Sequence, residues 1–307
     1  MRKKLARILA WAVTISLLVY LFHSISFTEI RTALTSASSW AIPTFVVLVL
    51  GVYLGDSFAI WKTFGWFVAR LSFPEVLIVR GATYLLALVN YTVGQGAIIY
   101  FVKRSRGVPL LRGTAAVILV MGINILLLLL FASLGLLIAP DVPPALYRIV
   151  LGAYGALAVY LVLLLLRPRW LTSRPIFDVL FAAGLSGHVR ALAVRVPHLA
   201  ALMAFTYASL RAFGIEVPVA QAIACLPIVY FISVLPIAVM GLGTTQAALI
   251  YFFHGYVPGA TPAGARASIL AASLVSQAVA LVVQGLIGAY CMRNQLARQL
   301  SEPAPTA

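Results

Sequence analysis

Long apolar stretches, divided by short polar segments, dominate the pattern of this chain. The stretches lie near residues 5–23, 41–61, 76–102, 114–139, 145–166, 198–214, 218–254 and 265–292. A helix of about 20 apolar residues crosses a hydrocarbon core of about 30 Å. Stretches of this length predict an all-α integral membrane protein, with a single membrane domain over residues 1–307.

Composition and charge narrow the class further. Hydrophobic residues make up 63% of the chain and charged residues 9%, with a mean hydropathy of +1.06, which excludes an ordinary soluble domain. The net charge of +15 comes from 22 Lys and Arg against 7 Asp and Glu. In a membrane protein such positive residues collect on the cytoplasmic side and meet anionic lipid there. We therefore expect no nucleic-acid partner.

The positions of Lys and Arg distinguish two topologies. If all eight stretches cross the membrane from a cytoplasmic N-terminus, 11 basic residues lie on each side. If 76–102 and 218–254 are re-entrant hairpins that turn near Gly94 and Gly241, 18 lie inside, Arg80 and Arg195 among them, and 4 lie outside. The positive-inside rule favours the second arrangement. We therefore predict about six transmembrane helices plus two opposed re-entrant hairpins, with both termini on the cytoplasmic side of the cell (inner) membrane.

A short internal repeat supports this arrangement. The residues from Gln95 to Phe101 read Q-G-A-I-I-Y-F, and those from Gln246 to Phe252 read Q-A-A-L-I-Y-F, 151 positions later. The repeat predicts two inverted half-repeats, about 1–140 and about 145–292, followed by a disordered cytoplasmic tail over 293–307. Paired halves with interrupted helices are typical of transporters that bind their substrate near the membrane centre.

Glycines and polar residues at both predicted hairpin tips form the main candidate site. Irregular backbone in a bilayer must be covered by protein or must line a polar cavity, so we expect the two tips to face each other. Helix N-termini after Gly94 and Gly243 would direct partial positive charge at a phosphate-bearing or hydroxyl-rich head group. The alternative is that Gly and Gln at these positions only mediate helix packing. The candidate substrate-binding residues are Asn90, Thr92, Gly94, Gln95, Gly96, Gly241, Gly243, Thr244, Thr245 and Gln246.

Asp56 is a further candidate, because it is the one acid well inside a predicted span. A carboxylate at the membrane centre costs about 2.5 to 3.5 kcal/mol on insertion scales, and this cost usually marks a functional residue. A hydrated carboxylate near the membrane boundary is the alternative, since Lys62 follows after about 9 Å of helix rise. Lys62 lies on another face of the helix, so any ion-pair partner of Asp56 must come from another helix.

Several motifs resemble those of a known family. The sequence V-N-Y-T-V-G-Q-G over 89–96, R-A-F-G-I-E over 211–216 and G-L-G-T-T-Q over 241–246 is similar to the lysylphosphatidylglycerol synthase transmembrane region, a flippase-like membrane protein that also occurs without its synthase domain. The resemblance covers nearly the whole chain. It implies movement of a phospholipid or a lipid-linked intermediate between leaflets, sometimes together with a synthase.

The chain also departs from this family's pattern. The family commonly has Gly-Glu in the first hairpin and Arg-Glu after Gly-Leu-Gly in the second, where this chain has Gly94-Gln95 and Thr245-Gln246. Asn124 stands where an Asp is frequent in the family. Neutral side chains thus replace buried charges, and the substrate need not be aminoacylated phosphatidylglycerol.

We expect a lipid translocase, flippase-like or scramblase-like, and not an enzyme. No G-x-S-x-G, Walker A or paired-carboxylate motif is present, and the four His residues lack metal-ligand spacing, so we predict no cofactor and no metal. Two alternatives remain open. One is an accessory subunit of an envelope lipid or glycan synthase, and the other is a membrane-embedded transferase that depends on Asp56. The basic segment from Pro175 to Pro197 is either an amphipathic helix on the membrane surface or a plain loop.

Overall fold

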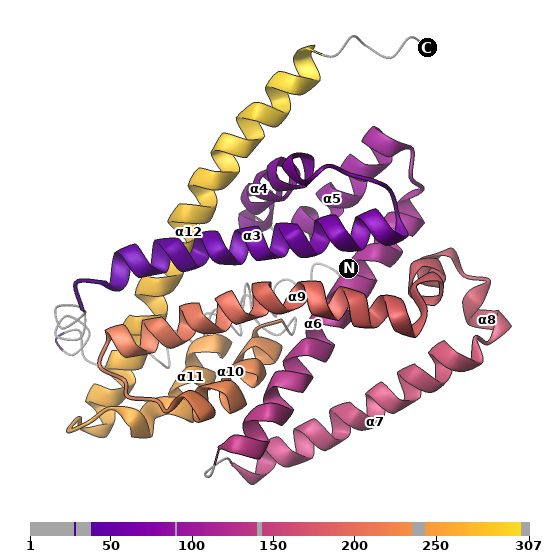
Figure 1. Cartoon of the computed structure of the whole chain (residues 1–307). Helices are drawn as coiled ribbons and strands as arrows, with labels where there is room; N and C mark the ends of the chain where they lie inside the picture. The colour runs from indigo at the N-terminus through magenta and orange to yellow at the C-terminus, as the bar shows by residue number, and fades with distance from the viewer. Residues whose placement is uncertain (1–27, 29–37, 90, 140–142, 235–242, 302–307) are drawn as a thin grey trace, which may run out of the picture. The chain divides into compact units, whose positions relative to one another are not determined.

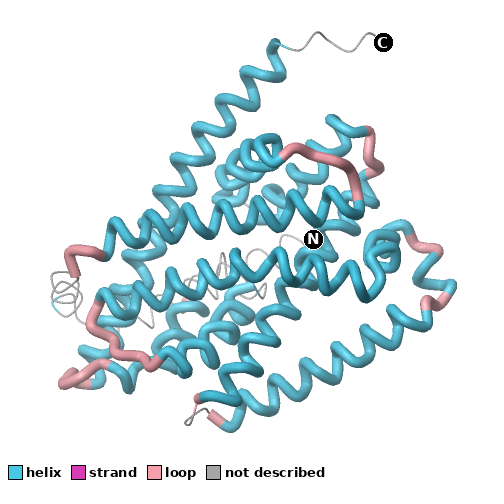
Figure 2. The backbone as a smooth tube through the Cα atoms, in the orientation of Figure 1, coloured by secondary structure: helices cyan, strands magenta, loops and turns pink. Residues whose placement is uncertain are grey.

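Helices make up the secondary structure of the computed structural model, which describes residues 28, 38–89, 91–139, 143–234 and 243–301 and contains no strand in these ranges (Figure 2). The helices, labelled in Figure 1, are α3 (Ala41–Phe67), α4 (Phe73–Val89), α5 (Tyr91–Arg106), α6 (Leu110–Ile138), α7 (Pro144–Leu166), α8 (Arg169–Thr172), α9 (Asp178–Ala212), α10 (Val219–Val234), α11 (Thr244–Phe253) and α12 (Pro262–Ser301). The all-α prediction is confirmed.

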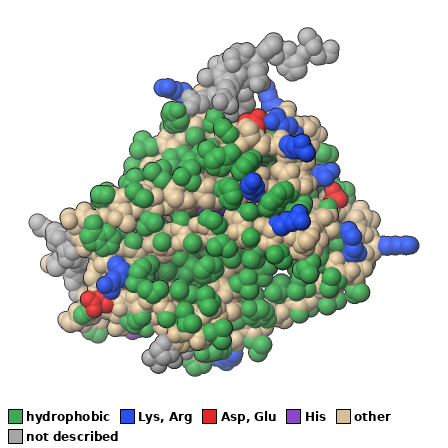
Figure 3. Space-filling model, in the orientation of Figure 1, with side chains coloured by type: hydrophobic (Ala, Val, Ile, Leu, Met, Phe, Trp, Pro, Cys, Tyr) green, Lys and Arg blue, Asp and Glu red, His purple; other side chains and the backbone are tan. Residues whose placement is uncertain are grey.

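Five helical segments of the described residues are long and apolar enough to cross a membrane. They are Ala41–Phe67, Leu110–Ile138, Pro144–Leu166, Pro175–Ala212 and Pro262–Arg293. Each corresponds to a predicted stretch, and the predicted first span, 5–23, lies outside the described residues. Large apolar side chains on these helices are exposed, among them Leu137 at 84% and Leu166 at 72%, and hydrophobic atoms cover much of the face drawn in Figure 3. Such a surface is compatible with lipid and not with water, as expected for a membrane protein.

The helix α9 is longer than the predicted span 198–214. It begins at Asp178, changes direction at Gly184, whose φ of 57° lies in the left-handed region, and runs through Pro197 to Ala212. The segment Pro175–Pro197 is therefore helical and not a plain loop. The span was predicted too short because Arg190 and Arg195 interrupt the apolar pattern within it.

Two pairs of short helices occupy the predicted hairpins 76–102 and 218–254. The first is α4 packed against α5, with 17 and 16 residues, and the second is α10 packed against α11. Helices α4 and α5 are each about 25 Å long, which is less than the thickness of the hydrocarbon core. Helix α4 ends at Val89 and α5 begins at Tyr91, so the predicted turn near Gly94 is wrong, and Gly94 lies inside α5. A helix tolerates an internal glycine at a cost of about 1 kcal/mol.

Contacts at the open ends define each pair as a helical hairpin. At the first hairpin, Nη2 of Arg106 donates to Oε1 of Glu75 at 2.9 Å, and Nε of Arg106 donates to the carbonyl of Arg70 at 3.1 Å. At the second hairpin, the amide of Glu216 donates to the carbonyl of Tyr256 at 2.7 Å. In both cases the residues before the first helix meet those at or just after the end of the second, so the chain returns to the end from which it started.

The chain divides into two compact units, each made of three chain segments. The first unit comprises Met1–Leu48, Leu128–Leu151 and Leu202–Val279, and the second comprises Val49–Leu127, Gly152–Ala201 and Ala280–Ala307. These units do not follow the predicted half-repeats 1–140 and 145–292, and the inverted repeat stays a prediction. At the end of the chain, α12 runs on to Ser301, so the residues just after 293 are helical where the sequence predicted a disordered tail.

Candidate functional site

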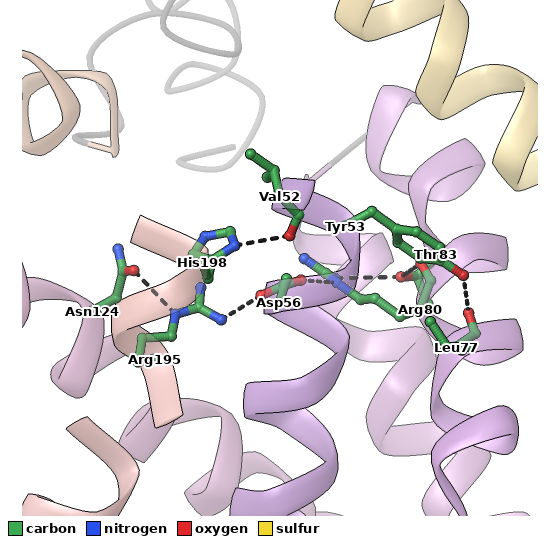
Figure 4. Close-up of polar contacts among 9 residues, drawn as sticks. All are labelled: Val52, Tyr53, Asp56, Leu77, Arg80, Thr83, Asn124, Arg195 and His198. Carbon is green, nitrogen blue, oxygen red and sulfur yellow. Dashed lines mark hydrogen bonds and ion pairs between the residues drawn. The ribbon is translucent and has the colours of Figure 1, made fainter. Parts of the chain in front are cut away.

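The carboxylate of Asp56 is the centre of a buried charge cluster in the second unit. Asp56 lies on α3 and is only 2% exposed. Its Oδ2 accepts a hydrogen bond from Nε of Arg80 on α4, and its Oδ1 accepts one from Nη1 of Arg195 on α9. In Figure 4 the carboxylate lies between the two guanidinium groups. The prediction that the partners of Asp56 come from other helices is confirmed, and Asp56 is not a hydrated residue at the boundary.

Neutral polar groups surround the ion pairs. Nε of Arg195 donates to Oδ1 of Asn124 on α6 at 3.3 Å, and Nη1 of Arg80 donates to the hydroxyl of Thr83 at 3.4 Å (Figure 4). Nδ1 of His198 lies 3.1 Å from the carbonyl of Val52. These contacts fix the directions of both guanidinium groups, because each arginine has a second acceptor besides the carboxylate.

Glycines on α3 bring α9 close to the cluster. A Cβ atom on Gly55 would lie 2.8 Å from Cα of His198, and one on Gly51 would lie 3.7 Å from Cβ of Ala201. Two small residues four positions apart form the kind of face on which membrane helices approach closely. Because Gly55 precedes Asp56 directly, the close approach of α3 and α9 lies next to the acid in the chain.

A further contact fixes α4, the helix that carries Arg80. The hydroxyl of Tyr53 donates to the carbonyl of Leu77 at 2.6 Å and lies 3.8 Å from Sγ of Cys291. A Cβ atom on Gly81 would lie 2.4 Å from the same sulfur. The second unit therefore holds the Arg80 helix between α3 and α12 with little free space.

The cluster contains more positive than negative charge. Two guanidinium groups and one carboxylate give these three side chains a formal charge of +1, and the side chains of Arg80, Arg195 and Asp56 are 13%, 10% and 2% exposed. Both arginines form an ion pair with the same carboxylate, that of Asp56. Removing ions from water costs several kcal/mol for each ion, and only close and well-aligned partners offset this cost. The site is thus suited to an additional anion.

The predicted tip residues of the first hairpin are only partly described. Asn90 lies outside the described residues, and Thr92 belongs to the first turn of α5 with its side chain likewise outside them. Gly94, Gln95 and Gly96 lie further along α5, with Gly94 buried, Gln95 partly buried and Gly96 exposed. Because α5 begins before Gly94, the expected helix N-terminus after this glycine does not exist.

The predicted tip residues of the second hairpin belong to the first unit. Gly241 lies outside the described residues, and Gly243, with a φ of 85°, directly precedes α11 as expected. Thr244 and Thr245 are partly buried in its first turn. The predicted common cavity of the two tips stays a prediction.

Gln246 has a local structural role. It is 1% exposed, and its Oε1 accepts a hydrogen bond from the amide of Gly243 at 2.7 Å. Its Nε2 donates to Oε1 of Gln277 on α12 at 3.2 Å. The side chain thus closes the start of α11 and links this helix to α12, which agrees with the packing alternative for this residue.

Sequence reasoning missed four members of the cluster: Arg80, Arg195, Asn124 and His198. The topology count places Arg80 and Arg195 on the cytoplasmic side, although both lie within helices that also carry apolar stretches. The signal that could have identified them is the buried acid itself, because a membrane carboxylate requires a cationic partner. Removing both arginines from the topology count leaves the positive-inside bias in place.

Neither a scan against protein-family models nor a search of the curated proteins finds a match for this chain. The resemblance to the lysylphosphatidylglycerol synthase transmembrane region therefore stays a prediction from its motifs. Among the described residues, no group of three or more His, Cys, Asp and Glu side chains is arranged to hold a metal ion.

Proposed function

We propose that the protein moves a phospholipid or a lipid-linked intermediate between the leaflets of the cell membrane, as a flippase or scramblase. The observation that carries this proposal is the buried cluster of Asp56, Arg80 and Arg195 in the second unit of an otherwise apolar protein. Ionisable groups inside membrane proteins are costly and mark the pathways of polar substrates. A lipid head group is such a substrate, and its acyl chains can stay in the surrounding bilayer.

The first hairpin supports the proposal because it supplies Arg80. Helices α4 and α5 are too short to cross the hydrocarbon core, and their open ends are joined through Arg106. Three basic residues, Lys103, Arg104 and Arg106, close the last turn of α5. We take the hairpin to be re-entrant from the cytoplasmic side. In this arrangement Arg80 enters the membrane from the cytoplasmic side and meets lipid of the cytoplasmic leaflet.

The direct test is lipid translocation by the purified full chain in liposomes. A fluorescent phospholipid in both leaflets is bleached from outside, and protein-dependent loss of the protected half reports translocation. Wild-type protein should accelerate this loss, and Arg195→Gln should abolish most of the acceleration. Arg190→Gln is the matched control, because Arg190 lies on the same helix and is exposed. A wild-type protein that moves neither phospholipid nor polyprenyl-linked lipid would refute the proposal, and co-purification of a stoichiometric synthase would then favour an accessory subunit.

The re-entrant topology has its own test. On a version without Cys225 and Cys291, single cysteines replace Lys103, Ser173 and Ala260, all exposed positions. A membrane-impermeant thiol reagent should label Ala260→Cys in intact cells and should reach Lys103→Cys and Ser173→Cys only after permeabilisation. Labelling of Lys103→Cys or Ser173→Cys in intact cells would restore plain crossings and contradict the hairpins.

A further inference from the structure

The charge cluster of Asp56, Arg80 and Arg195 also constrains the chemistry of its ligand. We infer that it binds the singly charged phosphodiester of a lipid and discriminates against doubly charged and zwitterionic head groups. The inference rests on the proposed function, since it assumes that a lipid reaches the cluster. It concerns which head group is bound, and it is tested separately from movement.

The guanidinium of Arg195 supplies the first argument. Its Nη1 donates to Asp56 and its Nε to Asn124, and within the described ranges nothing accepts a hydrogen bond from its Nη2. The residue is 8% exposed, so these donors are held in place and largely shielded from water. A planar guanidinium matches two phosphate oxygens better than a point charge does. The unused donors of Arg195 are therefore positioned for a phosphate oxygen.

Charge balance supplies the second argument. The formal charge of the three side chains is +1, so a phosphodiester with one negative charge would make the occupied cluster neutral. A phosphomonoester carries a charge of about −1.5 to −2 at neutral pH and would leave an excess negative charge. A choline head group adds a cation beside the phosphate, where two arginines would repel it. Because uncompensated charge is costly in a buried site, the singly charged diester is favoured.

Two kinds of lipid present this diester. One is an acidic glycerophospholipid such as phosphatidylglycerol, and the other is a sugar joined to a polyprenyl chain through one phosphate. Both lipids offer the cluster the same phosphodiester, and they differ in the groups that this phosphate joins. The test therefore includes both, and stronger binding of one over the other identifies the source without changing the inference.

The experiment measures binding of single lipids to the full chain in detergent at pH 8 by native mass spectrometry. The probes with matched acyl chains are phosphatidylglycerol, phosphatidic acid, phosphatidylcholine and diacylglycerol, and polyprenyl phosphate mannose is added as the second diester. Wild-type protein should bind a diester at least about tenfold more tightly than the monoester, the zwitterion and the neutral lipid, the ratio expected for one charge-assisted hydrogen bond. Arg190→Gln should keep this order.

Two substitutions alter the charge count in opposite directions. Arg195→Gln leaves one arginine and one carboxylate and should abolish the preference for the diester. Asp56→Asn leaves two arginines and should shift the preference to phosphatidic acid, which has the matching charge. A shift of preference is not produced by misfolding, and wild-type elution in size-exclusion chromatography is required of each variant before titration.

Equal binding of phosphatidylglycerol and phosphatidylcholine by the wild-type protein would overturn the inference. So would an unchanged preference in a folded Arg195→Gln protein. Translocation in liposomes without head-group preference would leave the proposed function intact and remove only this inference. Selective binding of the diester without translocation would support this inference and refute the proposed function.

Discussion

In both helical hairpins the residues before the first helix contact those at the end of the second, but the buried side chains of the two hairpins differ. In α4–α5 the ends are joined by the ion pair of Glu75 with Arg106, and in α10–α11 by one backbone hydrogen bond. Inside, the first contributes Arg80 to a charged cluster, whereas the second contributes Gln246 to a pair of neutral amides with Gln277. The common ends show how each hairpin returns on itself. The different interiors place a buried charge in the first hairpin and a neutral side chain that closes a helix start in the second.

The largest loss of stability is expected from removing Asp56, the acid on α3 that pairs with Arg80 of the first hairpin. Asp56→Ala removes the carboxylate that two largely buried guanidinium groups share. We expect a loss of about 3 to 5 kcal/mol, because a broken buried ion pair leaves uncompensated charge. The measurement is thermal unfolding in detergent. The control replaces Asp56, Arg80 and Arg195 together by Leu, which should recover stability but not lipid translocation. A stable and active triple variant would show that the cluster has no functional role.

In the second hairpin, Gln246→Leu should cost about 1 to 3 kcal/mol, because the amide of Gly243 and the side chain of Gln277 lose a buried partner. The matched control is Gln246→Glu, which keeps an acceptor for the Gly243 amide. We expect destabilisation in thermal unfolding with unchanged lipid preference. A changed head-group preference would contradict the division between the hairpins and return Gln246 to the binding site.

A comparable effect is expected from the helix contact next to Asp56. Gly55→Val introduces a side chain where a Cβ would already lie 2.8 Å from the backbone of His198, and overpacking of this kind costs about 1 to 3 kcal/mol. Gly65→Ala on the same helix is the control, since no atom of a neighbouring residue lies within 4 Å of the place that its Cβ would take. Unfolding temperatures should separate the two variants, and equal temperatures would mean that α3 and α9 are not in close contact.

The smallest effect is expected at the open end of the first hairpin. Burial alone would raise the pKa of Glu75, but hydrogen bonds from Ser72 and Arg106 outweigh it and hold this pKa below its ordinary value. Its contribution is therefore present above the ordinary carboxyl pKa and is lost as the pH falls through the lowered value. Glu75→Gln should cost less than about 1 kcal/mol at neutral pH, as for other exposed ion pairs. Unfolding temperatures of variant and wild type should converge at acidic pH, and a constant difference would exclude the ion pair as its cause.

The sequence predicted the all-α class and the five described spans, because both depend on long apolar stretches. The re-entrant hairpins stay a prediction. The sequence identified Asp56 and the need for partners on other helices, since a membrane acid must be compensated. It did not identify Arg80 and Arg195, because which of 22 basic residues faces one carboxylate depends on helix packing. The close contact at Gly55 and the start of α5 at Tyr91 likewise depend on neighbouring helices and not on local pattern.

The excess charge of the cluster has an electrical consequence. Moving one elementary charge through a membrane potential of 100 mV changes the free energy by about 2.3 kcal/mol. With its singly charged ligand bound, the cluster of Asp56, Arg80 and Arg195 would be neutral, and without it the cluster carries +1. Any step that shifts the empty cluster within the field would respond to voltage, and the same step with lipid bound would not. If the protein moves lipid as proposed, the membrane potential acts on the return of the unloaded protein and so sets the direction of net lipid movement.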